Sequence, residues 1–382
     1  MEQKLPLDGV TVVEICHSFA GPYAGSILAQ LGANVIKVEN PGRGDDARAW
    51  GPPNWGNTST SYHAMNRDKS GIALDMKDET EAAALRRFIV EEADVVIQSL
   101  RAGAIDPLGF GAAELRALKP SLIYCNLSAF GNVGPLKGKP GYDPLVQARS
   151  GLMSVTGNGG DPVRIGTSIV DMGSGMWCAI GILAALNKRN QTGEGTTVDA
   201  SLFETGLSWM TVHMAGYSAS GIVRKPMGSG LVEIVPHQAF TTCDGHVMIA
   251  AANDSLFSKL ATAIGRADLT TDPLYSTNNA RVINRETLIP LLNSILATNT
   301  ASHWVDVLDA AGVPIAPLQT IDQVAKDPQA EALGIFQKPE GVSDLALTGI
   351  PLNFDGQRPA LRRLAPDLGQ HNELVLGKEE SK

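Results

Sequence analysis

Asp171 is the residue whose setting most strongly suggests covalent chemistry. It lies in residues 165–177, where a short apolar strand is expected to lead into a long apolar helix. At such a junction, unpaired backbone N–H groups and the positive end of the helix dipole favour an ionised carboxylate. An ionised carboxylate is a potential nucleophile. An ordinary helix cap is the alternative, because aspartate is among the most favoured capping residues.

Other side chains with catalytic or metal-binding potential have less support. Ser174 stands in Gly-Ser-Gly, but no Gly-x-Ser-x-Gly elbow or ordered Ser/His/Asp set accompanies it, so a hydrolase is poorly supported. The histidines other than His17 are dispersed, and we expect them to be structural. The cysteines show neither zinc-ligand spacing nor a disulfide framework. They are Cys16, Cys125, Cys178 and Cys243.

Basic residues are frequent in the first third of the chain. Each alone could be ordinary solvated surface. Together they suit a ligand with several phosphate oxygens, because arginine offers a fork of donors and lysine a point charge. The group comprises Lys37, Arg43, Arg48, Arg67, Lys69, Lys77 and Arg101.

The elements that must position these residues alternate between strand and helix. Residues 9–15 and 33–39 have the pattern of buried strands, and Pro22 opens a helix over residues 21–31 between them. A helix over residues 81–93 precedes a strand at 93–98, and a further strand follows at 121–127. Such βαβ units predict a parallel sheet covered by helices. The fold class is therefore α/β, with a large Rossmann-like domain over residues 1–200.

The first βαβ unit does not match a dinucleotide site. Glu39 ends its second strand, where a ribose-binding acid would stand, but residues 20–25 lack the G-x-G-x-x-G fingerprint. Pro22 also removes an amide that could meet a pyrophosphate.

The rest of the chain predicts a second, smaller domain. Residues 201–225 form an apolar linker helix on which Leu207, Met210 and Met214 share one face. Strands and helices over residues 226–325 indicate an inserted α+β domain, and residues 326–382 follow it.

Composition narrows the class of protein. The 382 residues are 43% hydrophobic, enough for substantial cores, and carry a net charge of −9, which argues against nucleic acid or an anionic membrane as partner. The first residues lack the apolar region of a signal peptide, and the apolar stretch 176–186 is too short for a membrane span. We expect a cytoplasmic protein.

Several motifs, in order along the chain, resemble those of the class III CoA-transferases, the CaiB/BaiF or formyl-CoA transferase family. They occur at residues 20–25, 31–39, 66–77, 140–157, 165–177, 193–202, 234–240 and 365–371. The resemblance covers nearly the whole chain. It implies an acyl-CoA donor and a carboxylate acceptor as substrates, with no permanently bound cofactor and no metal. It further implies that Asp171 forms an aspartyl-acyl anhydride and then an aspartyl-CoA thioester.

The resemblance also implies which residues contact CoA. His17, Ser18, Phe19 and Ala20 would line the thioester end, while further contacts would come from Leu74, Lys77, Ser99, Leu100 and Arg101. This chain departs from the family pattern at three places: Asn40 and Pro107 stand where relatives often carry arginine, and Ser99 where many carry asparagine.

Tyr142 and Asp143 belong to a Gly-Tyr-Asp motif at the substrate site of the family. Related α-methylacyl-CoA racemases carry histidine at the position of Tyr142. A tyrosine, with a pKa of about 10, is poorly suited to exchange a carbon-bound proton, so CoA transfer is favoured over racemisation. A racemase or isomerase of the same fold and a non-catalytic acyl-CoA-binding protein remain alternatives.

Two further features follow from the resemblance. Gly228 and Gly230 match a glycine loop that covers the active site in the family, although a plain turn is equally compatible, and residues 231–233 depart from the relatives. The family also forms interlocked homodimers in which the C-terminal segment returns to the large domain. We expect the same here.

Overall fold

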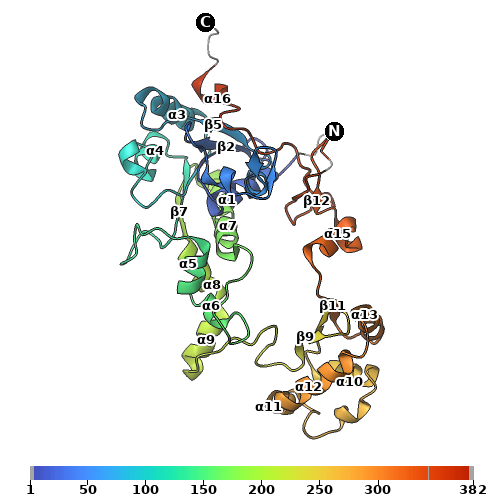
Figure 1. The fold of residues 1–382 in the computed structure, drawn as a ribbon. Coiled ribbons are helices and arrows are strands. Elements are labelled where there is room, and N and C mark those ends of the chain that lie inside the picture. Colours follow the sequence, from blue (N-terminus) through green and yellow to red (C-terminus); the bar gives the residue numbers. More distant parts are fainter. Residues whose placement is uncertain (1–3, 343, 378–382) are drawn as a thin grey trace. The chain divides into compact units, whose positions relative to one another are not determined.

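The computed structural model describes residues 4–342 and 344–377 (Figure 1). The chain divides into two compact units. The larger contains the chain up to Leu152, Ile165–Gly221 and the chain from Pro328 onward, and the smaller contains Met153–Arg164 and Ile222–Asp327.

The larger unit is built on a six-stranded sheet in the order β5-β2-β1-β6-β7-β8, in which every neighbouring pair is parallel. The central strands β1 and β6 are mainly buried Val and Ile, as expected where helices cover both faces. The predicted mixed α/β fold with a parallel central sheet is confirmed. The strands are β1 (Thr11–Ile15), β2 (Asn34–Glu39), β5 (Ser70–Ala73), β6 (Val95–Gln98), β7 (Ile123–Ser128) and β8 (Thr197–Ser201).

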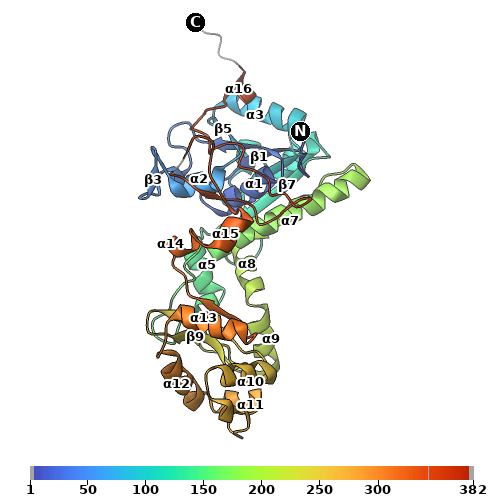
Figure 2. The ribbon, with the colours of Figure 1, turned by 90° about the vertical axis from the view of Figure 1, so that its right-hand side faces the viewer.

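Helices connect these strands and cover the sheet (Figure 2). A core of Val, Ile and Leu side chains lies between β1, β2, β6 and α3. The helices of this part are α1 (Ala20–Gln30), α2 (Thr60–Asn66), α3 (Glu79–Glu92), α4 (Ala112–Leu118), α5 (Asp143–Arg149) and α7 (Ile169–Thr192). The short helix α6 (Leu152–Val155) begins at the last residue of this part, and its other residues belong to the smaller unit.

The order of the strands places one crevice at the centre of the sheet. From β1 the chain moves outward to β2 and β5, and then returns to the other side of β1 with β6. The loops after β1 and β6 therefore diverge at the carboxyl edge. In open α/β sheets, this switch point is where ligands bind.

Helices α1 and α7 pack closely because α7 carries a glycine, Gly175, at their contact. A Cβ on Gly175 would lie 2.7 Å from the carbonyl oxygen of Ala20 and 3.0 Å from the amide nitrogen of Ala24. Such distances are shorter than normal contacts, so only glycine permits this approach. The packing brings the first turn of α7 beside the loop that follows β1.

The start of α7 differs from the sequence-based expectation. No strand precedes the helix among residues 156–168, and Ser168 is the N-cap, so Asp171 lies inside the first turn rather than at a strand-helix junction. The helix also extends well beyond the predicted apolar stretch. By length and composition alone its 24 residues could cross a membrane, but half of its apolar window is buried within the protein.

The apolar segment after β8 forms two helices, not the single one predicted. They are α8 (Leu202–Trp209) and α9 (Thr211–Ser220), and Met210 ends the first and begins the second. Met210 is buried, whereas Leu207 and Met214 are exposed, so the three predicted residues do not share one exposed face.

The C-terminal segment packs on the larger unit. The Asp68 carboxylate accepts the amide N–H groups of Arg362 and Arg363, and the amide of His371 donates to the carbonyl of Gly71. Its elements are α15 (Pro328–Leu333), β12 (Phe336–Gln337), β13 (Leu347–Thr348) and α16 (Glu373–Leu376).

The smaller unit is a three-stranded antiparallel sheet in the order β11-β10-β9, packed against helices. Its core includes Phe240, Phe257, Leu288 and Trp304. The elements are β9 (His237–Thr241), β10 (His246–Ala250), β11 (Ile315–Pro317), α10 (Asp254–Ala263), α11 (Asn278–Ile283), α12 (Arg285–Leu296), α13 (Ala301–Ala310) and α14 (Ile321–Val324).

Candidate active site

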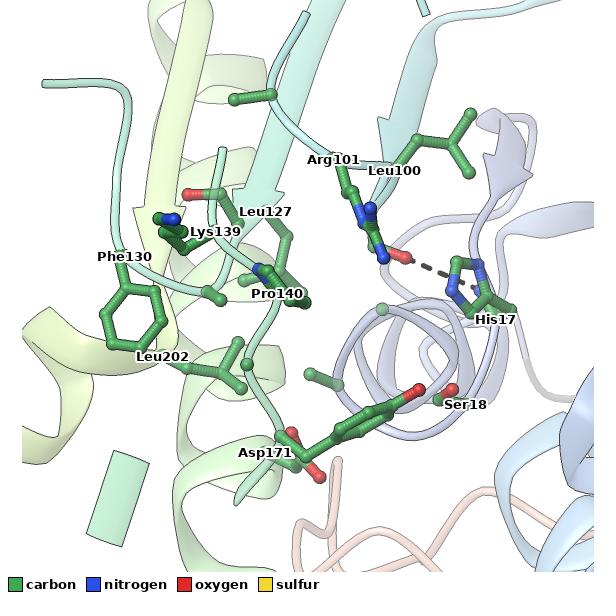
Figure 3. Close-up of a pocket in the computed structure, with 18 of the residues that line it drawn as sticks. His17, Ser18, Leu100, Arg101, Leu127, Phe130, Lys139, Pro140, Asp171 and Leu202 are labelled. Atoms are coloured by element: carbon green, nitrogen blue, oxygen red, sulfur yellow. Dashed lines mark hydrogen bonds between the residues drawn. The ribbon is translucent and has the colours of Figure 1, made fainter. Parts of the chain in front are cut away.

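A cavity of 460 Å³ opens at the switch point of the larger unit (Figure 3). Its walls come from the loops after β1, β6 and β7, from the segment before α5, and from the first turns of α7 and α8. Nine residues expected at the site from the sequence line it. They are His17, Ser18, Phe19, Ala20, Ser99, Leu100, Arg101, Tyr142 and Asp171.

A second cavity of 240 Å³ continues from the first, and His17, Leu100 and Leu108 line both. Leu74 and Lys77, also expected to contact CoA, lie in its wall, as does Asn40. Pro107 lies in a short 3₁₀ helix, Asp106–Leu108, next to the shared Leu108. Together the cavities could hold a long ligand across the carboxyl edge of the sheet.

Among the described residues that line the larger cavity, Asp171 is the single carboxylate. Figure 3 shows it at one end, with Arg101 and Lys139 farther along the walls. Within the described parts of the chain, no donor forms a hydrogen bond to its carboxylate oxygens. Burial, and then the nearby charge of Asp143, raise the pKa of Asp171 to about 7. The expectation of a fully ionised carboxylate held by the helix N-terminus is therefore wrong.

The reason is that another carboxylate occupies the helix N-terminus. Asp143 begins α5, is buried, and accepts the N–H groups of Val170 at 2.8 Å and Asp171 at 3.2 Å. Asp143 thus binds the backbone of the site, and it does not line the larger cavity. Its neighbour Tyr142 does line the cavity and has an exposed side chain.

The loop after β1 is held in place by a buried ion pair. The amide of Ser18, whose φ is 70°, donates to Asp45 Oδ1 at 2.9 Å. Lys37 Nζ in turn lies 2.8 Å from Asp45 Oδ2 and 3.3 Å from Glu14 Oε1, with all three side chains inaccessible to solvent. Desolvation lowers the pKa of His17 in this loop, so its ring is mainly neutral at pH 7.

The basic residues singled out in the sequence therefore divide into two groups. The cations of the first group form ion pairs with carboxylates inside the protein, so they cannot bind an external phosphate. The pairs are Lys37 and Lys69 with Glu14, Arg48 with Glu39, and Arg67 with Asp68. Buried cations require such partners. Those in the second group, Arg43, Lys77 and Arg101, are exposed at the two cavities.

Sequence reasoning missed several residues of the larger cavity. Lys139 adds a fourth exposed cation, and the only sequence signal was its place just before the Gly-Tyr-Asp motif. The rings of Phe19 and Trp50 stack with centroids 5.5 Å apart. Phe130 and Leu202 supply apolar surface. These residues lie far apart in the sequence, and only the sheet edge brings them together.

Gly228 and Gly230 belong to the smaller unit. The amide of Gly228, whose φ is 62°, donates to the carbonyl of Gly157 in the same unit. Among residues 4–342 and 344–377, no group of three or more His, Cys, Asp or Glu side chains could hold a metal ion.

The chain is similar to known proteins over nearly its whole length. Residues 7–372 match the model of CoA-transferase family III. The chain is 38% identical to the acetyl-CoA:oxalate CoA-transferase of Acetobacter aceti, over 98% of this chain and 96% of that protein. It is 33% identical to the human succinyl-CoA:glutarate CoA-transferase, over 98% and 86% respectively.

Solved structures agree with these sequence comparisons. A CaiB/BaiF family protein from Brucella suis superimposes with a TM-score of 0.88 at 36% identity, covering 98% of this chain and 99% of that one.

Proposed function

The chain belongs to CoA-transferase family III, and from this premise we propose that it moves CoA from an acyl-CoA donor to a carboxylate acceptor by covalent catalysis at Asp171. The resemblance noted in the sequence is thus confirmed, and the protein is a class III CoA-transferase. What remains to be assigned is the nucleophile, the CoA contacts and the acceptor.

One observation carries the proposal for the nucleophile. Asp171 is the single carboxylate in the wall of the 460 Å³ cavity, and within the described residues its oxygens have no hydrogen-bond donor. An unpaired carboxylate with a pKa of about 7 is a stronger base than an ordinary aspartate, yet is half ionised at neutral pH. Both properties suit nucleophilic attack on a thioester.

The reaction then proceeds in four balanced steps. The Asp171 carboxylate attacks the donor thioester carbonyl, the C–S bond breaks, and an aspartyl-acyl anhydride and CoA thiolate form. The thiolate attacks the aspartyl carbonyl of the anhydride, releasing the donor acid as a carboxylate and leaving an aspartyl-CoA thioester. The acceptor carboxylate attacks this thioester, giving a second anhydride and CoA thiolate. Thiolate attack on the acceptor acyl carbonyl yields the new acyl-CoA and regenerates Asp171.

The two cavities supply a path for CoA. The exposed cations Arg43, Lys77, Arg101 and Lys139 would bind its phosphates, because within the described residues none of them has a carboxylate partner within salt-bridge distance. Residues 17–20, with the neutral His17, would contact the pantetheine chain and thioester near Asp171. Backbone N–H groups of this loop are candidates to stabilise the developing oxyanion.

We propose a short dicarboxylate as the acceptor. The curated relatives include enzymes named for oxalate, glutarate, D-citramalate and mesaconate, all of which are small dicarboxylates. Succinyl-CoA and acetyl-CoA are the donors in those names.

The racemase alternative has less support. It requires a second acid/base group opposite Asp171, and the cavity offers Tyr142 where the racemases carry histidine. A non-catalytic acyl-CoA-binding protein would have no use for an unpaired carboxylate beside the thioester.

We further propose that the protein is an interlocked homodimer. Met176, Trp177, Ile180 and Leu183 of α7 are exposed in the single chain. They recur at helical spacing on one face, and such an apolar stripe is normally covered. A second copy of the chain would cover it.

A transfer assay tests the proposal. Succinyl-CoA and acetyl-CoA are each incubated with oxalate, glutarate, mesaconate and citramalate, and the new acyl-CoA is identified by mass. We expect transfer to at least one dicarboxylate, which Asp171→Asn abolishes while CoA binding remains. Transfer at the wild-type rate by Asp171→Asn would refute the assigned nucleophile.

A further inference from the structure

Asp143 makes contacts that a substrate-binding residue would not need. Its side chain is 2% exposed, and Oδ2 accepts the N–H groups of Val170 and Asp171. Its other oxygen accepts a hydrogen bond of 2.5 Å from Gln147 Nε2. Gln147 Oε1 in turn accepts the N–H of Ile165 at 2.8 Å, in the segment leading to α7. One side-chain pair on α5 therefore fixes both the first turn of α7 and the segment before it.

These contacts decide how the nucleophile is held. The first N–H groups of a helix have no partner within the helix, and an aspartate in the first turn normally folds back toward them. Here Asp143 already occupies two of these groups. The side chain of Asp171 is therefore left to the cavity, where it lines the wall (Figure 3).

We propose that Asp143 is a positioning residue for the nucleophile: it occupies the free amides of α7, leaves the Asp171 carboxylate unpaired, and sets a second negative charge beside it. This inference rests on the proposed role of Asp171. Asp143 itself never touches the substrate, because it lies buried behind the wall of the cavity.

The second charge acts differently on the free and acylated enzyme. Repulsion between two carboxylates disfavours the ionised form of Asp171 and, after burial, is the second cause that raises the pKa of this residue. Once Asp171 becomes an anhydride or thioester its charge is gone and the repulsion disappears. Asp143 thus destabilises the free nucleophile more than the acylated state, which accelerates the first attack.

Within residues 4–342 and 344–377, no other charged group raises the pKa of Asp171. Besides Asp171 itself, the titratable groups that line the cavity are Tyr142 at the start of α5, His17 in the loop after β1, Arg101 after β6, and Lys139 before α5. The two cations would lower the pKa of Asp171 rather than raise it.

The test compares the pH dependence of kcat/KM in wild type and in Asp143→Asn. Asparagine keeps an oxygen that can accept the amides but removes the charge. We expect the acidic limb of the kcat/KM profile of Asp143→Asn to lie at lower pH than that of the wild type, by on the order of one pH unit. The plateau at high pH should fall several-fold, because the nucleophile becomes less basic, with the KM for donor unchanged. Asp143→Glu, which restores the charge, should return the limb toward its wild-type position.

The chain offers a matched control. Asp78 caps α3 by accepting the amides of Thr80 and Glu81, each at 2.9 Å, but it is exposed and lines neither cavity. Asp78→Asn removes a capping carboxylate of the same kind and should leave the pH profile in place. Asp143→Ser, a second neutral capping residue, is used if Asp143→Asn does not fold.

The outcomes separate the inference from the function it rests on. If Asp171 is acylated in the wild type but the neutral variant keeps the wild-type acidic limb, Asp143 serves only the fold and the inference is overturned. If mass spectrometry of the wild type after incubation with acyl-CoA donor finds no covalent adduct on Asp171, the proposed function has failed instead.

Discussion

At the residue scale, the basic side chains fall into two groups: some are buried in ion pairs within the protein, and others are exposed where a ligand could bind. Lys37 and Lys69 lie among carboxylates inside the protein, whereas Arg101 and Lys139 are exposed at the cavity. The sequence could not make this distinction, because residue type alone does not show whether a lysine is buried beside a carboxylate or exposed at a cavity. Asp171 was identified from its motif, but its pKa depends on its burial and then on the charge of Asp143, 28 residues earlier in the chain.

The raised pKa of Asp171 predicts a gain in stability when its charge is removed. Its folded pKa of about 7 lies above the ordinary aspartate pKa of 3.8, so ionising Asp171 destabilises the fold progressively as pH rises between these values. Asp171→Asn should therefore raise the Tm by a few degrees at pH 8, with the gain vanishing toward pH 4. Calorimetry across this pH range measures the difference. A destabilised variant at pH 8 would contradict the pKa direction.

The exposed cations make a second prediction at this scale. Arg101→Ala removes a charge-assisted contact to a CoA phosphate, which should raise the KM for the acyl-CoA donor roughly tenfold and leave kcat nearly unchanged. Lys188→Ala, an exposed lysine near the far end of α7, is the control and should change neither constant. Equal KM values for wild type and Arg101→Ala would remove Arg101 from the CoA site.

At the element scale, the parallel sheet was predictable and the helix ends were not. The buried, mainly apolar runs at β1, β2, β6 and β7 are local signals, so the pattern of apolar residues suffices to find them. The amides at the start of α7 are bound instead by the distant Asp143. Neither the start of α7 nor the break at Met210 can be read from the local pattern of apolar residues. The cavity residues 17–20 and 99–101 came from the family resemblance, and the strand order explains why they meet.

The glycine contact between α1 and α7 gives a prediction at this scale. In Gly175→Ala the new methyl group would meet backbone atoms of Ala20 and Ala24, which cannot move aside as a side chain would. Overpacking should cost roughly 1–3 kcal/mol, outweighing the gain of about 1 kcal/mol in helix propensity. Because Gly175 lies one turn from Asp171, we also expect transfer to slow by roughly tenfold or more.

Denaturant unfolding and the transfer assay measure the two effects. Asn187→Ala, at an exposed position of the same helix, should be close to neutral in both. Wild-type stability and rate in Gly175→Ala would show that the helices do not need this close approach.

At the scale of the whole molecule, the exposed apolar face of α7 predicts a dimer. Light scattering should give a mass near twice 40.3 kDa. If the chains are interlocked, this mass will not fall on dilution, because the subunits cannot separate without unfolding. A stable, active monomer would exclude the interlocked arrangement.

The central claim, covalent catalysis at Asp171, can be tested most directly by mass spectrometry of the enzyme after incubation with acyl-CoA donor. We predict that the peptide containing Asp171 gains the mass of a CoA thioester, that hydroxylamine removes the label, and that Asp171→Ala carries none. A label on any other residue, or full transfer activity in Asp171→Ala, would contradict the account.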